Sequence, residues 1–485
     1  MPTLRRSNHR LSHYRLATMD MGYLVPVAFM EVLMGDSFRH ASSALIRVAP
    51  LVAPLMHPVD VRIHHWYVPF RTIWDDWDKF ITGQSTPTFP TVTYTNGVDD
   101  YKLTDALGLP DATNTVSALP YRAYNKIYNE YYRDQDLITE VSEDSLDMQR
   151  IAWEKDYFTS CRASAQQGSS FSIPFSSGSA PVTGIGVDDT ETFAGSSPAA
   201  YDSTGSLVGD PTVPSGGNQL RVKGLNTGDV SSSNPPQIFA DLSSATGGID
   251  INEFRLAMAQ QKHVEARNRY GERIQEYLAY HGIRAADGRL DIPEYLGGGR
   301  QTISFSEVLA TGTESGATNL GDLAGHGIAA VRTRSYNRFF SESGILMSLM
   351  SIRPRTMYLK QIHRFWLRNE KDDFWQKEYE ELGPQAVLDK EVYGAHGNAT
   401  DVFGYTGRHD EYRHQPSYVS GEFRDSTHWD WHLGRDFTVS QTLNQAFVEC
   451  TPTDRVYANT AEAEIKAMVS HHINAKRLVR KRAKY

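Results

Sequence analysis

The sequence predicts a mainly β protein in which short antiparallel strands pack into a sandwich. Apolar runs with the alternation or the length of a strand outnumber runs with helical spacing, and no β-α-β alternation is present. The 37 glycines and 22 prolines favour many turns over a helical bundle. With 485 residues, 40% of them hydrophobic, the chain can bury a substantial core, and we expect residues 1–485 to form one domain with insertions.

The most regular strand pattern covers residues 59–69, VDVRIHHWYVP. Val59, Val61 and Ile63 alternate with polar side chains, which is the two-residue period of a strand with one buried face. Pro69 has no N–H to donate and is expected to end the ladder. The nearly continuous apolar run GILMSLMSIRP, residues 344–354, predicts a fully buried strand of a sandwich.

A short amphipathic helix is expected directly after the first of these strands. Thr72 is its expected N-cap and Gly83 its C-terminal stop. Four apolar side chains would share one face, namely Ile73, Trp77, Phe80 and Ile81. Trp74 falls outside that face, so its ring is expected to contact something beyond the local core.

The rest of the chain adds two helical segments and several short strands. Residues 121–160 are expected to form a helix followed by a loop, and residues 252–283 one long helix or two. The stretch DIPEYLGGGR at 291–300 indicates a turn-rich stop. Further strands are expected at 357–366, 417–424 and 436–441.

Residues 165–250 differ sharply in composition from their surroundings. This stretch is rich in Gly, Ser, Thr and Pro, lacks tryptophan, and has no basic residue between its start and Arg221. Such a segment cannot bury a core of its own. Because connections between elements are typically about 4–6 residues long, we interpret it as a surface insertion and not as a linker.

Positive charge gathers at the two ends of a chain whose formal net charge is −9. An acidic average surface does not attract nucleic acid, but two basic ends predict localised contact with a polyanion. We expect a basic N-terminal arm at 1–20 and a basic C-terminal tail at 476–485; the alternative is that both are simply solvated. The candidate phosphate-contacting residues are Arg5, Arg6, Arg10, Arg15, Lys476, Arg477, Arg480, Lys481, Arg482 and Lys484.

Compartment signals point to a soluble protein made in a cytoplasm. Cys161 and Cys450 are the only cysteines, which excludes a disulfide framework or a cysteine metal cluster. The first residues lack the apolar run of a signal peptide, and no segment approaches the roughly 18 apolar residues of a membrane span. We therefore expect no membrane insertion.

No motif for catalysis, cofactor binding or metal binding is found. Phosphate loops, GxGxxG with the correct context and GxSxG are missing, and neither cysteine has the surroundings of a nucleophile. His428 and His432 have the four-residue spacing of helical metal ligands, but no third ligand is defined and HExxH is absent. We predict no catalytic, cofactor-binding or metal residues and no enzymatic activity.

Seven stretches of the sequence carry a family likeness: 35–83, which includes HHWYVPFRTIWDDWDKFITG, then KDYFTS at 155–160, 254–283, RLDIPEYLGGG at 289–299, FSESGILMSLMSIRP at 340–354, 382–394 and 402–424. Taken together and in order, they resemble the major capsid proteins of the Microviridae, small icosahedral bacteriophages with circular single-stranded DNA. The likeness is nearest to the gokushovirus branch, and it covers most of the chain outside 161–250 and the two ends. The segment CRASAQQG after DYFTS departs from the gokushovirus pattern and suggests a neighbouring lineage.

This resemblance implies an eight-stranded antiparallel jelly roll with long, partly helical insertions between strands. It implies a structural protein whose copies assemble into a T=1 icosahedral shell around single-stranded DNA, in the virion, after assembly in the bacterial cytoplasm. A scaffolding protein, a minor DNA-pilot protein and a host surface receptor are the further partners it implies. The insertion at 165–250 would then be a candidate for an outer protrusion.

Two questions remain open at the level of sequence. Trp66, Trp74 and Trp77 are expected to anchor packing within the subunit or across a contact between subunits, with Trp74 favoured for the contact. The alternative function is a cellular jelly-roll protein that binds carbohydrate, supported by the tyrosine-rich segment 121–132 and by HWDWH at 428–432.

Overall fold

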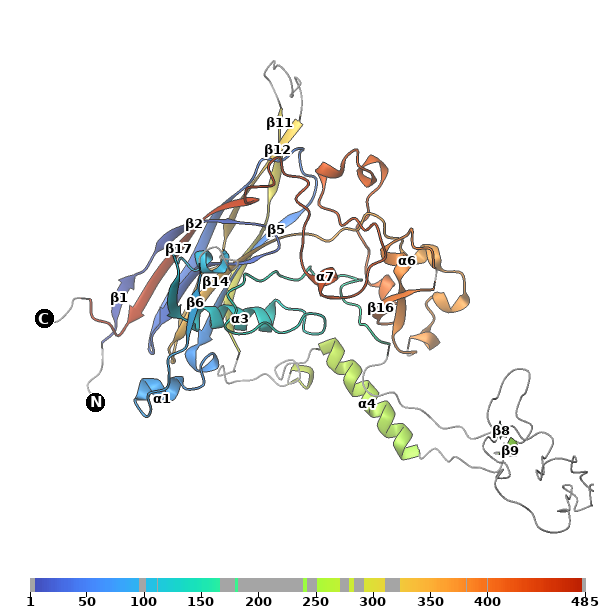
Figure 1. The fold of residues 1–485 in the computed structure, drawn as a ribbon, viewed down its shortest axis with the longest axis horizontal. Helices are drawn as coiled ribbons and strands as arrows, with labels where there is room; N and C mark the ends of the chain where they lie inside the picture. Colours follow the sequence, from blue (N-terminus) through green and yellow to red (C-terminus); the bar gives the residue numbers. More distant parts are fainter. Residues whose placement is uncertain are drawn as a thin grey trace, which may run out of the picture. The chain divides into compact units, whose positions relative to one another are not determined.

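Two antiparallel β-sheets form the framework of the chain in the computed structural model (Figure 1). The residues it describes are 5–95, 102–110, 112–165, 179–181, 239–241, 251–270, 279–282, 292–309, 323–380, 382–398 and 400–481. The chain divides into two compact units, residues 1–165 with 283–485 and residues 166–282. Both large sheets belong to the first unit.

The larger sheet has seven strands in the described residues and combines the two ends of the chain. Its central order is β1–β17–β4–β12–β11, while β2 pairs with β17 and β13 with β4. Because β1 and β2 pair with β17, segments from opposite ends of the sequence lie side by side (Figure 1). The strands are β1 (Ser7–Arg10), β2 (His13–Met19), β4 (Ser37–Val48), β11 (Ser304–Leu309), β12 (Leu323–Arg332), β13 (Tyr336–Phe339) and β17 (Ile465–Arg477).

The smaller sheet has, in the part of the chain that the structure describes, four strands in the order β10–β5–β14–β3. Two of them are the strands that the sequence predicted most clearly, and their bounds agree with the prediction: β5 (Val59–Pro69) and β14 (Gly344–Pro354). They pair along their whole lengths, from Gly344 opposite Pro69 to Pro354 opposite Val59. The outer strands are β3 (Leu24–Val32) and β10 (Glu294–Thr302).

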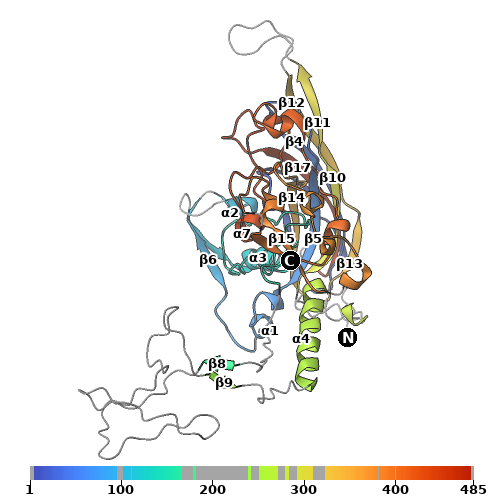
Figure 2. The same ribbon diagram turned by 90° about the vertical axis from the view of Figure 1, so that its right-hand side faces the viewer.

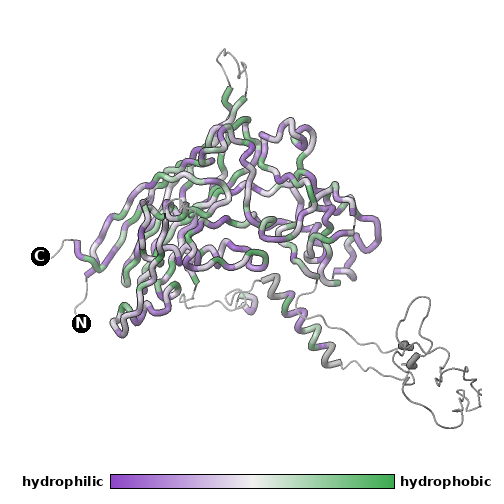
Figure 3. Tube along the Cα trace, in the orientation of Figure 1, coloured by the Kyte–Doolittle hydropathy of each residue, from purple (hydrophilic) through white to green (hydrophobic). Residues whose placement is uncertain are grey.

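The inner faces of the two sheets meet in one hydrophobic core. Ile46 and Val469 of the large sheet lie in the same buried cluster as Val61, Ile63 and Met350 of the small sheet. All five are fully buried, and each such side chain contributes roughly 1.5–3 kcal/mol relative to an exposed one. Figure 3 shows hydrophobic and hydrophilic residues alternating along the long strands, as expected for sheets with one face in the core. The prediction of a mainly β antiparallel sandwich is confirmed.

A tyrosine-rich helix, α3 (Leu119–Tyr131), packs against the small sheet and forms a second core with it. Tyr121, Tyr124 and Tyr128 lie on one face of the helix and are buried. The Tyr124 hydroxyl donates a 2.7 Å hydrogen bond to the Leu24 carbonyl, so its polar end is satisfied. These rings are therefore part of the core and cannot be presented to a glycan, which removes the main support for the carbohydrate-binding alternative.

Apart from α4, the remaining elements are short and lie mostly in segments between the framework strands (Figure 2). In the first unit they are α1 (Trp77–Thr82), α2 (Lys102–Ala106), α6 (Asp389–Val392), α7 (Gln445–Val448), and the strand pairs β6 (Thr91–Tyr94) with β7 (Asn114–Ser117) and β15 (Gln385–Leu388) with β16 (Val402–Thr406). Seven short 3-10 turns add Phe70–Thr72, Arg364–Leu367, Lys371–Asp373, Lys377–Tyr379, Asp410–Tyr412, Gly421–Arg424 and Trp429–Trp431. The second unit contains α4 (Ile251–Tyr270) and the pair β8 (Ser179–Pro181) with β9 (Phe239–Asp241).

Several local predictions are wrong. The glycines at 297–299 do not form a turn but lie in β10. Glycine suits these positions of the strand because the neighbouring backbone comes too close to leave room for a side chain. A Cβ on Gly298 would collide with the Ile63 carbonyl oxygen, and one on Gly299 would lie 2.8 Å from the Arg332 carbonyl oxygen. The segments 357–366, 417–424 and 436–441 form 3-10 turns and irregular chain instead of strands.

The helix after β5 begins later than predicted. Residues 70–72 form a 3-10 turn, and α1 starts at Trp77 after Asp76, so Thr72 is not its N-cap. Gly83 does end the helix, in the left-handed conformation with φ 74°. Helix 252–283 is confirmed as far as Tyr270, and most of the predicted insertion at 165–250 lies outside the described residues.

Candidate nucleic-acid interface

The outward face of the large sheet carries many basic side chains. Strand alternation sends Arg39 and Arg47 of β4 to this face, because the intervening Phe38, His40 and Ile46 are buried in the sandwich. The same alternation exposes the even-numbered residues of β17. The basic side chains of this face, which we call the basic sheet face, are Arg10, Arg39, Arg47, Arg332, Lys466 and Lys476, together with the imidazoles of His326 and His472. Lys466 is ion-paired with Glu462 at 3.3 Å.

Strand register brings these residues into rows across the sheet. Arg10 of β1 lies opposite Asn474 of β17, which lies opposite Arg39 of β4. Further along, Lys466 lies opposite Arg47. Among the described strand residues that point outward from this sheet, none is an aspartate or glutamate. The face is therefore positive on a chain whose net charge is −9.

A hollow of about 460 Å³ lies in the middle of this face. Arg39 and Arg332 line it together with the small side chains of Ala41 and Ser43. Two guanidinium groups beside small residues leave room for an anionic group and supply donors for it. Tyr14 of β2, with 73% of its surface exposed, adds an aromatic ring to the same face.

Beneath this face lies a buried histidine cluster, His40, His65 and His471. The ring of His40 lies 4.5 Å from that of His65 by centroid, and Ser42 Oγ is within 3.0 Å of a ring nitrogen of both His40 and His471. Burial, and then the neighbouring histidines, lower the pKa of His40 to about 2; burial lowers that of His65 to about 3 and that of His471 to about 4. The cluster is therefore uncharged at neutral pH and acts in packing.

The structure divides the basic residues predicted from sequence into several groups. Arg10 and Lys476 lie on the basic face, and Arg5, Arg480 and Lys481 are exposed near its end. Arg6 donates to the Gly35 carbonyl and to Ser37 Oγ. Arg482 and Lys484 lie outside the described residues.

Arg15 and Arg477 are not available to a polyanion on this face. Arg15 points to the other side of β2, where it donates to the Asp105 carbonyl and where burial lowers its pKa. Arg477 forms a 2.9 Å ion pair with Asp36, whose carboxylate is fully buried, and so neutralises a charge inside the fold. Residues 7–19 form strands β1 and β2, so this part of the predicted N-terminal arm belongs to the sheet.

Sequence reasoning missed most of the basic face. Arg39, Arg47, Arg332 and Lys466 come from three strands that are distant in sequence, and none stands in a charge run. The alternation FRHASSALIR at 38–47 did contain a signal, since Arg39 and Arg47 are eight positions apart and an even spacing puts both on the same face of a strand.

The three predicted tryptophan anchors lie in the core of the first unit or pack against it. Trp66 and Trp74 are only 4% and 7% exposed and belong to the same buried cluster as α3. Trp74 is thus packed within its own chain, and its expected contact with a neighbouring subunit stays a prediction. Trp77 is half-buried against this cluster, with its ring 4.4 Å from that of Phe70 by centroid.

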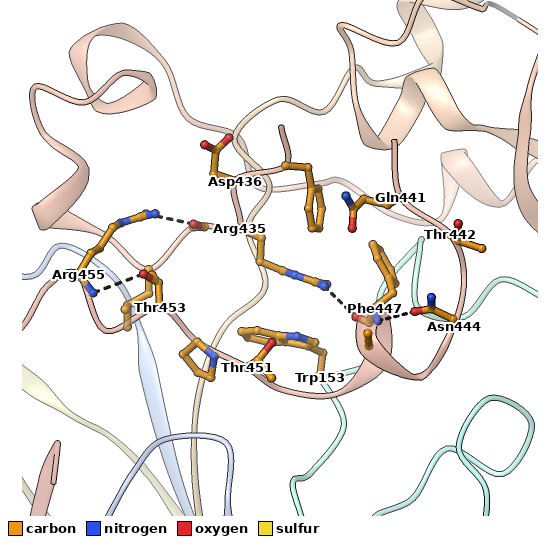
Figure 4. A pocket seen from close by; sticks show the side chains of 15 residues that line it. Trp153, Arg435, Asp436, Gln441, Thr442, Asn444, Phe447, Thr451, Thr453 and Arg455 are labelled. Carbon is orange, nitrogen blue, oxygen red and sulfur yellow. Dashed lines mark hydrogen bonds between the residues drawn. The ribbon is translucent and has the colours of Figure 1, made fainter. Parts of the chain in front are cut away.

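A second hollow, of about 370 Å³, lies beside α7 (Figure 4). The Arg435 guanidinium forms part of its wall, lies 4.4–5.5 Å from the centres of four aromatic rings and donates to the Phe447 carbonyl. The rings belong to Trp153, Tyr358, Phe437 and Phe447. Their faces stabilise the cation, so this arginine holds the surrounding segments together.

The histidines of the described residues do not gather into a metal centre. This part of the chain contains no group of three or more His, Cys, Asp or Glu side chains arranged to hold a metal ion. His432, one of the two histidines with metal-ligand spacing, uses both ring nitrogens in hydrogen bonds to the Phe423 carbonyl and the Gly434 N–H. No described helix is long and apolar enough to cross a membrane.

An antiparallel sandwich in which the described outward strand positions of one sheet carry basic and no acidic residues defines the class as a mainly β structural protein with a surface suited to a polyanion. Comparison with known proteins gives the family. The Capsid protein (F protein) family matches residues 1–481, and the chain belongs to this family.

Two relatives match this chain over nearly its whole length. The chain is 33% identical to Capsid protein VP1 of Bdellovibrio phage phiMH2K, over 93% of this chain and 89% of the relative. It is 30% identical to Capsid protein VP1 of Chlamydia phage 1, over 94% and 91%. Capsid protein F of Escherichia phage G4 is 30% identical over a shorter region, 26% of this chain and 30% of that protein. The resemblance to Microviridae capsid proteins is confirmed, and the family's structural role agrees with the prediction that the chain is not an enzyme.

Proposed function

We propose that this chain is the major subunit of a T=1 icosahedral phage shell and that its basic sheet face lies toward the packaged circular single-stranded DNA. The observation that carries the orientation is the absence of acidic residues among the described outward strand positions of a sheet that bears Arg39, Arg47 and Arg332. A chain with a net charge of −9 repels DNA over most of its surface. The basic sheet face is the exception.

The chemistry of this face suits binding without sequence recognition. Arg and Lys side chains neutralise phosphates and release counterions, which gives affinity that depends on salt and not on base identity. The exposed ring of Tyr14 provides a stacking surface for an unpaired base. Asn474, between Arg10 and Arg39 in the same row, adds a neutral donor. These groups suit a single strand because its bases are free to stack.

The sandwich is proposed to be the eight-stranded jelly roll of viral shells, extended by further strands. Two antiparallel sheets with a shared core, joined by long irregular segments, support this assignment. A shell built from many copies of one chain also needs different surfaces that fit one another on neighbouring copies. The segments between the strands supply such surfaces without disturbing the core.

Further partners and the place of assembly are proposed from the family alone. They are a scaffolding protein, a minor DNA-pilot protein and a host surface receptor, with assembly in the bacterial cytoplasm. The segment 165–250 remains the proposed outer protrusion, a position that predicts early cleavage when intact particles are treated with protease. The basic residues at 476–485 other than Arg477, which stays paired with Asp36, are proposed to contact DNA together with the basic sheet face.

The experiment that tests this function is co-expression of the chain with the other structural proteins of its phage. Closed particles that contain nuclease-protected circular single-stranded DNA are the expected product in electron microscopy and nuclease assays. Discrete small oligomers without nucleic acid would refute the proposal. A particle that encloses DNA but whose DNA content is unchanged when Arg39, Arg47 and Arg332 are replaced by Gln would refute the orientation of the sheet.

A further inference from the structure

Exposed aromatic side chains gather in two segments, 365–375 and 412–418, that lie between β14 and β17 in the sequence. We call this group the aromatic patch, and it consists of Phe365, Trp366, Phe374, Trp375, Tyr412 and Tyr418. Each of these side chains is between 46% and 77% exposed, and Trp366 is the most exposed. Large aromatic rings normally lie mostly in the interior or at interfaces. So many exposed rings in two neighbouring segments therefore require an explanation.

A buried ion pair supports part of the aromatic patch. Beneath it, Arg368 and Glu411 form a buried ion pair at 2.6 Å, and Glu411 also accepts a 3.1 Å hydrogen bond from Gln385. The Arg368 guanidinium lies 4.3 Å from the ring centre of Tyr412 and 5.5 Å from that of Phe374. A charged pair that is hydrogen-bonded inside the fold fixes the rings above it.

Other contacts join the two segments that carry the rings. The backbone N–H of Trp375 donates a hydrogen bond to the Tyr412 hydroxyl at 3.4 Å. The side chain of Gln361 donates to the Ser417 carbonyl, which places the segment before Trp366 beside the one that carries Tyr418. The rings of Phe374 and Tyr412, which these contacts hold in place, lose little conformational entropy when they are covered, and this favours binding.

The charges around the aromatic patch favour a protein partner over DNA. Exposed residues of both signs surround the rings, including Glu370, Lys371, Asp372, Lys377 and Glu378. Phosphates would be repelled by these carboxylates, whereas an aromatic centre with a mixed polar rim is typical of a protein interface. The patch therefore differs in kind from the basic sheet face.

We propose that the aromatic patch is buried against a second copy of this chain when the shell forms, an inference that rests on the proposed shell function. An aromatic side chain buries about 150–250 Å², so the exposed parts of these six rings amount to roughly 700 Å². A stable interface buries about 800 Å² on each partner, so the aromatic patch supplies most of one side. If it stayed uncovered on a finished particle, a surface with two tryptophans would promote aggregation.

Radical footprinting of the unaltered chain tests this directly. Oxidation of Trp366 and Trp375 is measured by mass spectrometry in unassembled chain and in closed particles, with buried Trp153 as the unreactive baseline. We expect assembly to reduce the oxidation of both rings about fivefold or more, as for side chains at the centre of an interface. Equal oxidation in the two states would overturn the proposal. If the unaltered chain forms no particles at all, the proposed shell function fails instead.

Variants give a second measurement. The double change Trp366→Ala and Trp375→Ala should lower particle yield about tenfold while soluble, folded chain accumulates, since buried tryptophans contribute strongly to interfaces. Leu16→Ala is the matched control, because Leu16 is an apolar side chain that is 72% exposed but lies in β2, away from the aromatic patch. It should leave particle yield unchanged. Normal particles from the double variant that fail to adsorb to host cells would make the aromatic patch a receptor surface and would overturn the second-copy proposal.

Discussion

Removing charge from the basic sheet face should weaken the dependence of DNA binding on salt. The perturbation is the pair Arg39→Gln and Arg332→Gln, which removes both guanidiniums from the lining of the central hollow. For a single strand, the slope of log K against log salt concentration changes by about 0.7 for each phosphate that the protein no longer neutralises. If each arginine neutralises one phosphate, the slope becomes shallower by about 1.4.

The assay is fluorescence anisotropy of a labelled single-stranded oligonucleotide with unassembled chain over a range of salt concentrations. The control pair is Arg413→Gln and Lys377→Gln, which removes the same net charge from exposed positions away from the sheet. This control should keep the slope of the unaltered chain. The orientation of the sheet would be refuted if both pairs changed the slope equally, because binding would then depend only on net charge.

Three further predictions concern the stability of the fold. In the folded chain, the pKa values of the histidine cluster lie below the unfolded value of about 6.5. Below pH 6.5 the unfolded chain therefore binds more protons than the folded chain. The stability that the neutral rings contribute is lost as the pH falls from about 6.5 toward 4. The melting temperature should fall over this window, and less steeply in His40→Gln; a parallel fall in both proteins would contradict this origin. Arg435→Lys should lower the free energy of unfolding in urea by about 1–2 kcal/mol, because the lysine ammonium lacks the flat guanidinium that lies against four rings. An unchanged urea midpoint would refute this role of Arg435. Gly298→Ala should lower stability by about 1–3 kcal/mol because its Cβ would meet the backbone of β5, while Gly397→Ala, where the space is open, should have little effect; equal effects would contradict the close approach.

The basic sheet face and the aromatic patch have opposite chemistry, and this makes their roles separable. The basic sheet face has cations without acids among its described outward strand positions, and the aromatic patch has large rings with charges of both signs around them. Substitutions in the basic sheet face should therefore alter the amount of packaged DNA. Substitutions in the aromatic patch should alter the particle yield. Measuring both quantities for each variant tests the two assignments against each other.

The sequence by itself determined the elements whose signals are local. Alternation predicted β5 and the long apolar run predicted β14, because strand period and burial depend on neighbours along the chain. The long matching stretches, among them HHWYVPFRTIWDDWDKFITG, also determined the family, since they need no knowledge of the fold.

Only the tertiary structure decided which side chains share a surface. The basic sheet face takes Arg10, Arg39, Arg332 and Lys466 from four strands spread over the whole chain, and their proximity follows from pairing across the sheet. The same pairing turned Arg477 inward to meet the buried carboxylate of Asp36, although it stands in the basic run that looked most favourable for DNA. Charge composition is a property of the sequence, but the direction of a side chain is set by the face of the sheet on which it lies.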